Sequence, residues 1–298
     1  MKTNFFLSVI IIVLNGFVYA QPLPSNVLID ERTTGRGHYK TLGAYDSEPS
    51  TKSNPLDAQR FPVSEKEKER LRSRSPYYLA ADPSLVKVAP PPANSSLQTR
   101  RELDYLLPLQ HQRSEEDVRA SLFYAGVWYN TSTRPGDKDY NYFQKNLFHI
   151  GRSIGNWFNY DSLPLTRQLI SNAWRDANYF IWYYKYHYAR IRPYKIDTSI
   201  KNLEQTNWPA YPSAHAGNSY VAAYIYSALA PEFFDFFIKD AFDMAHSREI
   251  IGVHYPGDSE SARVMARQIV DLLLKNEKFL TDFENVKSEW QEVRSRNF

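Results

Sequence analysis

The sequence predicts an all-α protein whose main part is a single helical bundle. Apolar residues recur at helical spacing in one segment after another from residue 97 onward, and no convincing run of alternating residues typical of strands appears. Hydrophobic residues make up 43% of the 298-residue chain, which is enough for a proper core. The 22 Tyr, 17 Phe and 6 Trp concentrate in the second half of the chain and suit a packed core. We therefore expect helices packed on helices.

Charge and cysteine content exclude several classes of protein. The formal net charge is only +3, and it falls to +2 without residues 1–20, so no global basic field favours nucleic acid or an anionic membrane as a partner. Any attraction for anions must be local. The chain contains no cysteine, which excludes disulfides, thiolate metal sites and cysteine nucleophiles.

Residues 1–20 have the pattern of a cleaved export signal. Lys2 supplies a short positive region, an apolar run covers residues 5–14, and small residues precede a cleavage site after Ala20. The alternative is an uncleaved membrane anchor, for which the apolar run is short. We expect signal cleavage near Ala20 and a secreted or periplasmic protein.

The next segment, residues 21–75, is polar and rich in Pro, Ser, Gly and charged residues, without a sustained apolar period. This composition predicts a linker or a disordered extension. Close opposite charges in residues 65–72 allow a short solvated helix there, with a docking role as the alternative. The helical domain accordingly covers residues 76–298.

The first half of this domain begins with a proline block. Pro90 to Pro92 form a stiff extended segment that a helix cannot pass through. Capping side chains at 94–96 then precede a helical pattern that Pro108 interrupts. Similar amphipathic runs predict helices over residues 114–126 and 140–158.

A long helix is expected from about Pro164 to Ile191. Proline suits the first turn of a helix, and Pro193 ends this one. Its later part, residues 178–188, is aromatic almost all round and should be buried on most sides. Further helices are expected from Ser213 or Ala214 to residue 230, and over residues 232–250, 257–276 and 278–294.

Two basic residues in the long helix are candidates for anion binding. Lys185 and Arg192 lie seven positions apart, which corresponds to two helical turns, so we expect both on one face near the C-terminal end. Such a pair alone usually marks a solvated face. Here the surroundings are aromatic and no carboxylate lies at the same helical level, so the pair favours a bound anion. Arg190, on another face, is expected to be a structural ion-pairing residue.

A second candidate lies at the expected helix start near Ser213. Helix N-termini present unpaired backbone N–H groups and a partial positive charge. The Ser213 hydroxyl and the Ala214 amide would therefore form a phosphate cradle with His215 beside it. The alternative is plain N-capping by Ser213.

The third candidate is the stretch 247–258. Arg248 offers a bidentate anion contact, and Asp258 follows His254 by four positions, a spacing at which the carboxylate can fix the tautomer of the ring. The alternative is a helix end with a surface histidine.

Together these segments resemble the signature of the type-two phosphatidic acid phosphatase and vanadium haloperoxidase superfamily. The matching segments are Lys185-x6-Arg192-Pro193, Pro212-Ser213-Ala214-His215 and Ser247-Arg248-x5-His254-x3-Asp258. Within the superfamily, residues 187–194 and 211–215, the triple proline and the size of the chain look most like the bacterial class A non-specific acid phosphatases. The resemblance covers about residues 76–290 and leaves the preceding extension unexplained.

The resemblance implies a metal-independent acid phosphatase with no cofactor and an active site between the helices. His254 would attack phosphorus and form a phosphohistidine, with Asp258 orienting its ring. His215 would protonate the leaving group and then activate water. The phosphoryl oxygens would be held by Lys185, Arg192, Ser213, the Ala214 amide and Arg248. The family usually has glycine where this chain has Ala214, and we expect activity to survive that difference.

Other functions remain open from the sequence. A lipid phosphatase or a vanadate-dependent haloperoxidase would use the same cradle, and a phosphate-binding module without turnover is the alternative from another class. The expected partners are small phosphomonoesters rather than nucleic acid, with no integral membrane segment after signal removal. A homo-oligomer is compatible with the sequence. The physiological substrate, the oligomeric state and the role of residues 21–75 are not fixed by it.

Overall fold

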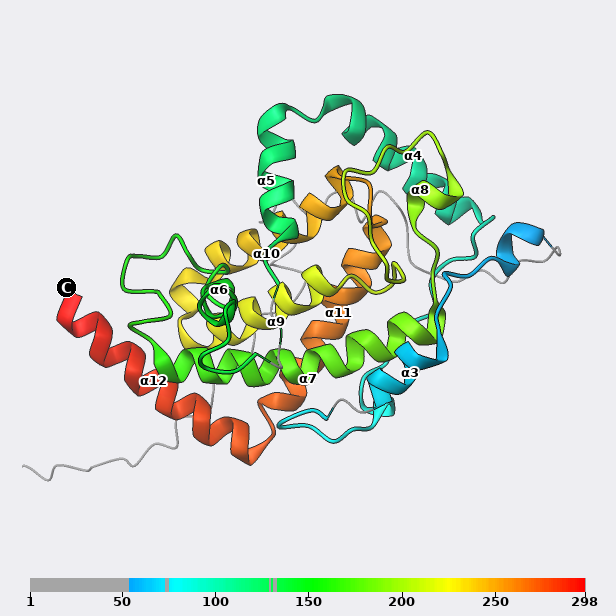
Figure 1. Ribbon diagram of the computed structural model, residues 1–298. Helices are drawn as coiled ribbons and strands as arrows, with labels where there is room; N and C mark the ends of the chain where they lie inside the picture. The colour runs from blue at the N-terminus through cyan, green and yellow to red at the C-terminus, as the bar shows by residue number, and fades with distance from the viewer. Residues whose placement is uncertain (1–53, 73–74, 129, 131–132, 298) are drawn as a thin grey trace, which may run out of the picture.

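The computed structural model describes residues 54–72, 75–128, 130 and 133–297, and within these ranges the protein is built of helices without strands. This confirms the all-α prediction. The expected signal, residues 1–20, and the extension up to residue 53 lie outside the described residues. The helices are α3 (Glu65–Arg72), α4 (Leu97–Gln112), α5 (Glu115–Ala125), α6 (Tyr140–Asn146), α7 (Pro164–Tyr188), α8 (Pro193–Ile196), α9 (Ala214–Leu229), α10 (Phe234–Ile250), α11 (Pro256–Leu273) and α12 (Glu277–Asn297), with 3-10 turns at Pro55–Ala58, Pro83–Leu85 and Pro231–Phe233 (Figure 1).

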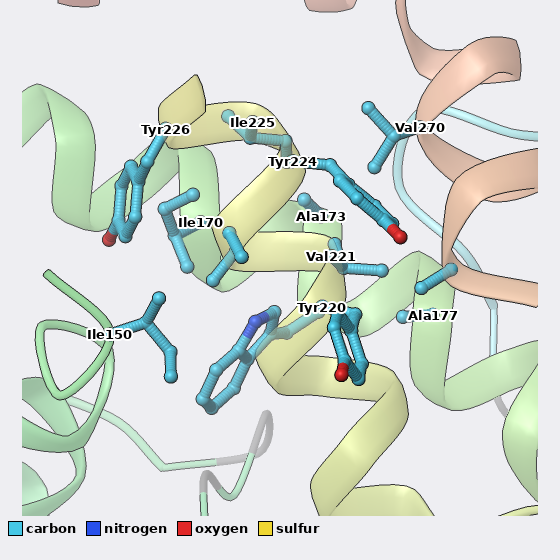
Figure 2. Packing of buried hydrophobic residues seen from close by; sticks show 14 of the residues in the cluster. Ile150, Ile170, Ala173, Ala177, Tyr220, Val221, Tyr224, Ile225, Tyr226 and Val270 are labelled. Atoms are coloured by element: carbon cyan, nitrogen blue, oxygen red, sulfur yellow. The ribbon is translucent and has the colours of Figure 1, made fainter. Parts of the chain in front are cut away.

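Helix α9 lies at the centre of the bundle and packs against α7, α10 and α11. Its sequence is apolar or aromatic nearly all round, so it can bury every side, and Val221 and Ile225 are fully buried. Figure 2 shows α9 side chains lying beside Ile170 of α7 and Val270 of α11. At Gly217 a Cβ atom would come within 2.9 Å of the Ile181 side chain, so glycine permits the close approach of α7 and α9.

The outer helices cover this centre. Helix α5 packs on α10, and α12 packs on α7 (Figure 1). The start of α5 is fixed by a capping box between Ser114 and Asp117, in which each side chain accepts from the other residue's backbone N–H. The predicted helices over 114–126, 213–230 and 232–250 agree with α5, α9 and α10.

Three predicted helix boundaries in the first two thirds of the chain are wrong. The helix expected over 140–158 ends at Asn146, because Gly151 and Gly155 take φ angles of 91° and 146° that a helix does not allow. Helix α4 continues through Pro108 to Gln112, although proline inside a helix costs about 3 kcal/mol. Burial of the leucines on its inner face offsets that cost.

The third correction concerns the end of the long helix. Helix α7 ends at Tyr188 rather than Ile191, because Ala189 adopts the left-handed conformation with φ 47° and ψ 42°. The backbone from Arg190 to Arg192 therefore leaves the helix before Pro193 begins α8. This change of direction matters for the site described below.

The described end of the 21–75 segment contacts the domain. The Asn94 side chain donates to the Leu56 carbonyl at 2.8 Å, and the Phe61 N–H donates to the Ala189 carbonyl at 2.8 Å. The second contact reaches the residue that ends α7. These residues are thus attached to the bundle, unlike the free linker expected from their composition.

Candidate active site

The candidate residues meet where helix ends converge. The C-terminal end of α7, the N-terminus of α9, the C-terminus of α10 and the N-terminus of α11 lie close to the connection between α8 and α9 (Figure 1). Most of the candidate side chains are buried, and His215 and Ala214 are half-buried. The buried ones are Lys185, Arg192, Ser213, Arg248, His254 and Asp258.

His254 and Asp258 form a dyad at the start of α11. The distance from His254 Nδ1 to Asp258 Oδ2 is 2.9 Å, and the Tyr255 N–H donates to the same oxygen at 3.0 Å. Because a carboxylate only accepts, we assign the proton of the ring to Nδ1, which leaves a lone pair on Nε2. Burial and the neighbouring Arg192 lower the pKa of His254 well below its ordinary value, so the ring is neutral.

The other oxygen of Asp258 belongs to a buried ion-pair network. Arg190 donates to Asp258 Oδ1 at 2.7 Å and to Glu102 Oε2 at 2.6 Å, and its guanidinium lies 3.8 Å from the centre of the Tyr255 ring. The second Glu102 oxygen accepts from the Gly257 N–H at 2.8 Å. Burial opposes ionisation of Asp258, but Arg190 and His254 outweigh it and hold its pKa at about 2. The carboxylate that positions His254 is therefore itself fixed and charged.

Lys185 and Arg192 face backbone carbonyls rather than acids. Lys185 Nζ donates to the carbonyls of Pro209 and Ala210 at 2.8 and 3.1 Å. Arg192 Nε donates to the Trp208 carbonyl at 2.9 Å. Burial lowers the pKa of Lys185 well below its ordinary value and that of Arg192 to about 10. Neither cation has a carboxylate as hydrogen-bond partner within the described part of the chain.

The sequence predicted that the two cations lie on one face of a helix, and this prediction is wrong. Lys185 is on α7, whereas Arg192 lies beyond the left-handed Ala189, at the residue before α8. The chain reverses there, and the Ala210 N–H donates to the Arg190 carbonyl at 2.9 Å. Arg192 Nη1 then donates to the Val253 carbonyl at 2.6 Å and lies 3.0 Å from His254 Nε2. The turn, rather than the helical period, brings Arg192 to the histidine.

Arg248, near the end of α10, is the third buried cation of the site. Its Nη2 donates to the carboxylate of Glu204, on the connection between α8 and α9. Its Nε and Nη1 atoms are buried and have no hydrogen-bond partner within the described ranges. Unpaired buried donors are costly, so these two N–H groups indicate a place for an acceptor.

The N-terminus of α9 contributes Ser213, Ala214 and His215. The Ser213 side chain accepts from the Ala216 N–H over a long 3.4 Å, so it acts as the N-cap. Ala214 is the first helical residue, and N–H groups in a first turn have no partner within the helix. The turn is tied to α11, because the Ser213 N–H donates to the Asp258 carbonyl at 3.0 Å.

His215 is held from its other side by α5. Its Nε2 lies 3.3 Å from the Ala125 carbonyl at the end of that helix. Since a carbonyl only accepts, Nε2 carries a proton and Nδ1 is the atom left for the site. Burial, followed by the charge of Arg248, lowers the pKa of His215 well below its ordinary value. The two histidines are thus both neutral at neutral pH, and they are oriented by different partners.

The candidate site lies within a range of residues that matches the model of a known protein family. The model of the PAP2 superfamily matches residues 168–275, and this range contains every residue of the candidate site. Over these residues the chain is similar to the PAP2 superfamily. Helix α4 with Glu102 lies outside the matched range.

A protein of known activity is similar to this chain in sequence. The chain is 28% identical over 138 residues to a non-specific acid phosphatase of Providencia stuartii, an alignment that covers 44% of this chain and 55% of the relative. The chain thus matches about half the length of that protein.

Two solved structures have a similar fold. A bacterial vanadium-dependent iodoperoxidase has a TM-score of 0.51 at 20% identity, with 74% of this chain and 62% of that chain covered. A holo-type bacterial vanadium-dependent chloroperoxidase has a TM-score of 0.51 at 11% identity, with 78% and 60% covered. At these identities the likeness concerns the fold alone.

The sequence did not predict two acids that contact the site residues, Glu102 and Glu204. Glu204 follows no motif. Glu102 carried a weak signal, because it lies on the face of α4 that buries Leu103 and Leu106, where a charged residue requires a partner. Arg190, expected to be a structural ion-pairing residue, is that partner.

Among the residues that the structure describes, none of the helices has the length and hydropathy that a membrane-spanning helix needs. The described residues also contain no group of three or more His, Cys, Asp or Glu side chains arranged to hold a metal ion.

Proposed function

We propose that this protein is a metal-independent acid phosphatase that hydrolyses small phosphomonoesters through a phosphohistidine on His254. The observation that carries the proposal is the lone pair on His254 Nε2, which lies 3.0 Å from a buried guanidinium and is fixed by Asp258 through the opposite ring nitrogen. A neutral, oriented imidazole beside cations is suited to attack a phosphate ester. The similarity to a non-specific acid phosphatase supports the same activity.

The reaction would proceed in two displacements. His254 Nε2 attacks phosphorus as the bond to the ester oxygen breaks, and protonated His215 gives its proton to the departing alkoxide. In the second step His215 removes a proton from water, which attacks the phosphohistidine and releases phosphate and the free His254 ring. Asp258 stabilises the ring charge that develops in the first step.

The phosphoryl oxygens would be held by the cradle. Lys185, Arg192 and the two unpaired N–H groups of Arg248 supply positive charge, and the Ser213 hydroxyl and Ala214 amide supply donors at the start of α9. Such donors, fixed before the reaction, stabilise the transition state without reorganisation.

The setting of this activity is part of the proposal. We place the catalytic domain at residues 76–298 and its action outside the cytoplasm, after removal of residues 1–20. The similarity to the Providencia stuartii enzyme is consistent with a secreted or periplasmic phosphatase. Small phosphomonoesters are the proposed substrates, and nucleic acid is not proposed as a binding partner.

The test is a His254→Ala variant assayed with a generic aryl phosphate. We expect wild-type turnover that EDTA leaves intact and a loss of at least about 10³-fold in the variant. A phosphoenzyme should be trapped in the wild type and absent from the variant. His111→Ala, which truncates an exposed histidine on α4, is the matched control and should retain full activity.

Three results would contradict the proposal. Near-wild-type activity of His254→Ala would show that His254 is not the nucleophile, and loss of activity on chelation would indicate a metal enzyme. Halide oxidation in the presence of vanadate and peroxide, without phosphate release from esters, would favour a haloperoxidase instead.

A further inference from the structure

Glu204 is a carboxylate that no known motif assigns and that contacts the cradle directly. It accepts a hydrogen bond from Arg248 Nη2, while the Arg248 Nε and Nη1 atoms have no partner within the described ranges. The Arg248 side chain is 1% exposed, whereas that of Glu204 is 31% exposed. The acid therefore lies between the buried cradle and solvent.

The position of Glu204 is fixed by the backbone around it. The Leu203 N–H donates to the Ile251 carbonyl at 3.1 Å, just beyond α10, and the Asn202 side chain donates to the Glu204 carbonyl at 2.7 Å. The segment that carries the acid is thus fastened to the end of the helix that carries Arg248. The backbone itself therefore holds the Glu204 and Arg248 side chains close together.

The charge of Glu204 acts on more than one member of the cradle. Burial lowers the pKa of Arg248, and Glu204 is the charge that opposes this shift. Glu204 also opposes the burial-induced lowering of the pKa of Arg192, together with Asp258. Asp258 is already engaged by Arg190 and His254, so Glu204 is the acid that balances the cradle itself.

We propose that Glu204 compensates the charge of Arg248 in the empty cradle and weakens the binding of inorganic phosphate there, which speeds product release. The proposal rests on the phosphatase function proposed above. A phosphate dianion on the free N–H groups of Arg248 would lie a few ångströms from the Glu204 carboxylate. Like charges at that distance beside a buried site repel, so the Glu204 carboxylate would oppose retention of the phosphate product.

The test is a Glu204→Gln variant and its affinity for inorganic phosphate. Glutamine keeps the size and the acceptor oxygen for Arg248 but removes the negative charge. We expect the dissociation constant of phosphate, measured by calorimetry, to fall roughly tenfold, and its competitive inhibition constant to fall by the same factor. Because screening weakens such repulsion, the gain should shrink at high salt.

Two further variants separate charge from structure. Glu204→Asp keeps the charge and should restore weak phosphate binding. Glu232→Gln removes a carboxylate from an exposed pair with Arg294, beside the C-terminal end of α9 and away from the site, and should leave phosphate affinity unchanged. A purely structural role of Glu204 predicts weaker binding in Glu204→Gln, which is the opposite sign.

Unchanged or weaker phosphate binding by Glu204→Gln would overturn the inference, even if the wild type hydrolyses esters normally. Tighter binding by a protein that releases no phosphate from esters would support the role of Glu204 in the cradle and reject the phosphatase function. Calorimetry therefore tests the role of Glu204, and the ester assay separately tests the phosphatase function.

Discussion

The buried charges of this protein form two groups that differ in how they are paired. In the network at the start of α11, Arg190 is bound by Glu102 and Asp258, and Asp258 also holds His254. In the neighbouring cradle, Lys185 and Arg192 donate to carbonyls, and two nitrogens of Arg248 have no hydrogen-bond partner in the described part of the chain. Arg190 Nε also lacks a hydrogen-bond partner in the described part of the chain, but the charge of Arg190 is balanced by two carboxylates. The three cations of the cradle face a single carboxylate partner there, Glu204.

The network is suited to hold His254 in position, whereas the cradle is suited to bind an anion. An ion-pair network with balanced charges resists change, because loss of one partner leaves an uncompensated buried charge. A group of buried cations with too few carboxylates costs stability in the free protein and regains it when an anion arrives. Variants in the first group should therefore affect folding, and variants in the second should affect ligand binding.

The largest expected effect is that of Arg190→Met. Removing the guanidinium leaves Glu102 and Asp258 buried without their shared partner, which should lower the free energy of unfolding by about 3–5 kcal/mol. Denaturant unfolding followed by circular dichroism measures this. The control Arg294→Met removes an exposed arginine paired with Glu232 and should cost at most about 1 kcal/mol. Equal losses in both variants would contradict the distinction between the two groups.

Lys185→Met should break the cradle without breaking the fold. We expect kcat/KM for an aryl phosphate to fall about 100-fold, because one charge that stabilises the transition state is lost. The free energy of unfolding should stay the same or rise, since burial already disfavours the charged lysine. Lys239→Met, at an exposed position on α10, is the control. A large loss of stability in Lys185→Met would show that this lysine belongs to the structural group.

The pH dependence of activity tests how the cradle acts on His215. Burial and Arg248 hold the pKa of His215 below its ordinary value of 6.5, so in the free enzyme the proton needed by the leaving group is present only at acidic pH. We expect kcat/KM to fall as the pH rises, with the decline beginning below 6.5. Arg248→Met removes the charge that lowers the pKa of His215 most, although Lys185 and Arg192 remain, and should move the decline to higher pH. A decline at unchanged pH would mean that another group limits the rate.

The smallest effect is expected from Ala214→Gly. Ala214 is the first residue of α9, and its φ angle is not positive. Its methyl group therefore imposes no backbone strain. We expect kcat/KM to change by less than about threefold, as measured with an aryl phosphate. An inactive wild type that glycine restores would show that the methyl group obstructs the phosphate.

Local patterns in the sequence were sufficient for much of the fold. The apolar periodicity of α5, α9 and α10 placed those helices within a few residues. The pattern failed where backbone conformation decides: at Ala189, whose left-handed turn has no side-chain signal, and at Gly151 and Gly155, whose positive φ angles end an otherwise helical run. At Pro108 the pattern predicted an interruption of the helix that does not occur. Packing of α4 outweighed the strong tendency of proline to break a helix.

For the site, the sequence by itself determined the residue types and local contacts such as the one between His254 and Asp258. Asp258 lies four residues from His254, so the geometry of a single turn is enough to join them. The tertiary structure decided the rest. Glu102 reaches the Gly257 N–H across 155 positions, and Glu204 reaches Arg248 across 44. No local spacing encodes such contacts, because they exist only once the ends of α7, α9, α10 and α11 have packed together and removed their charges from water.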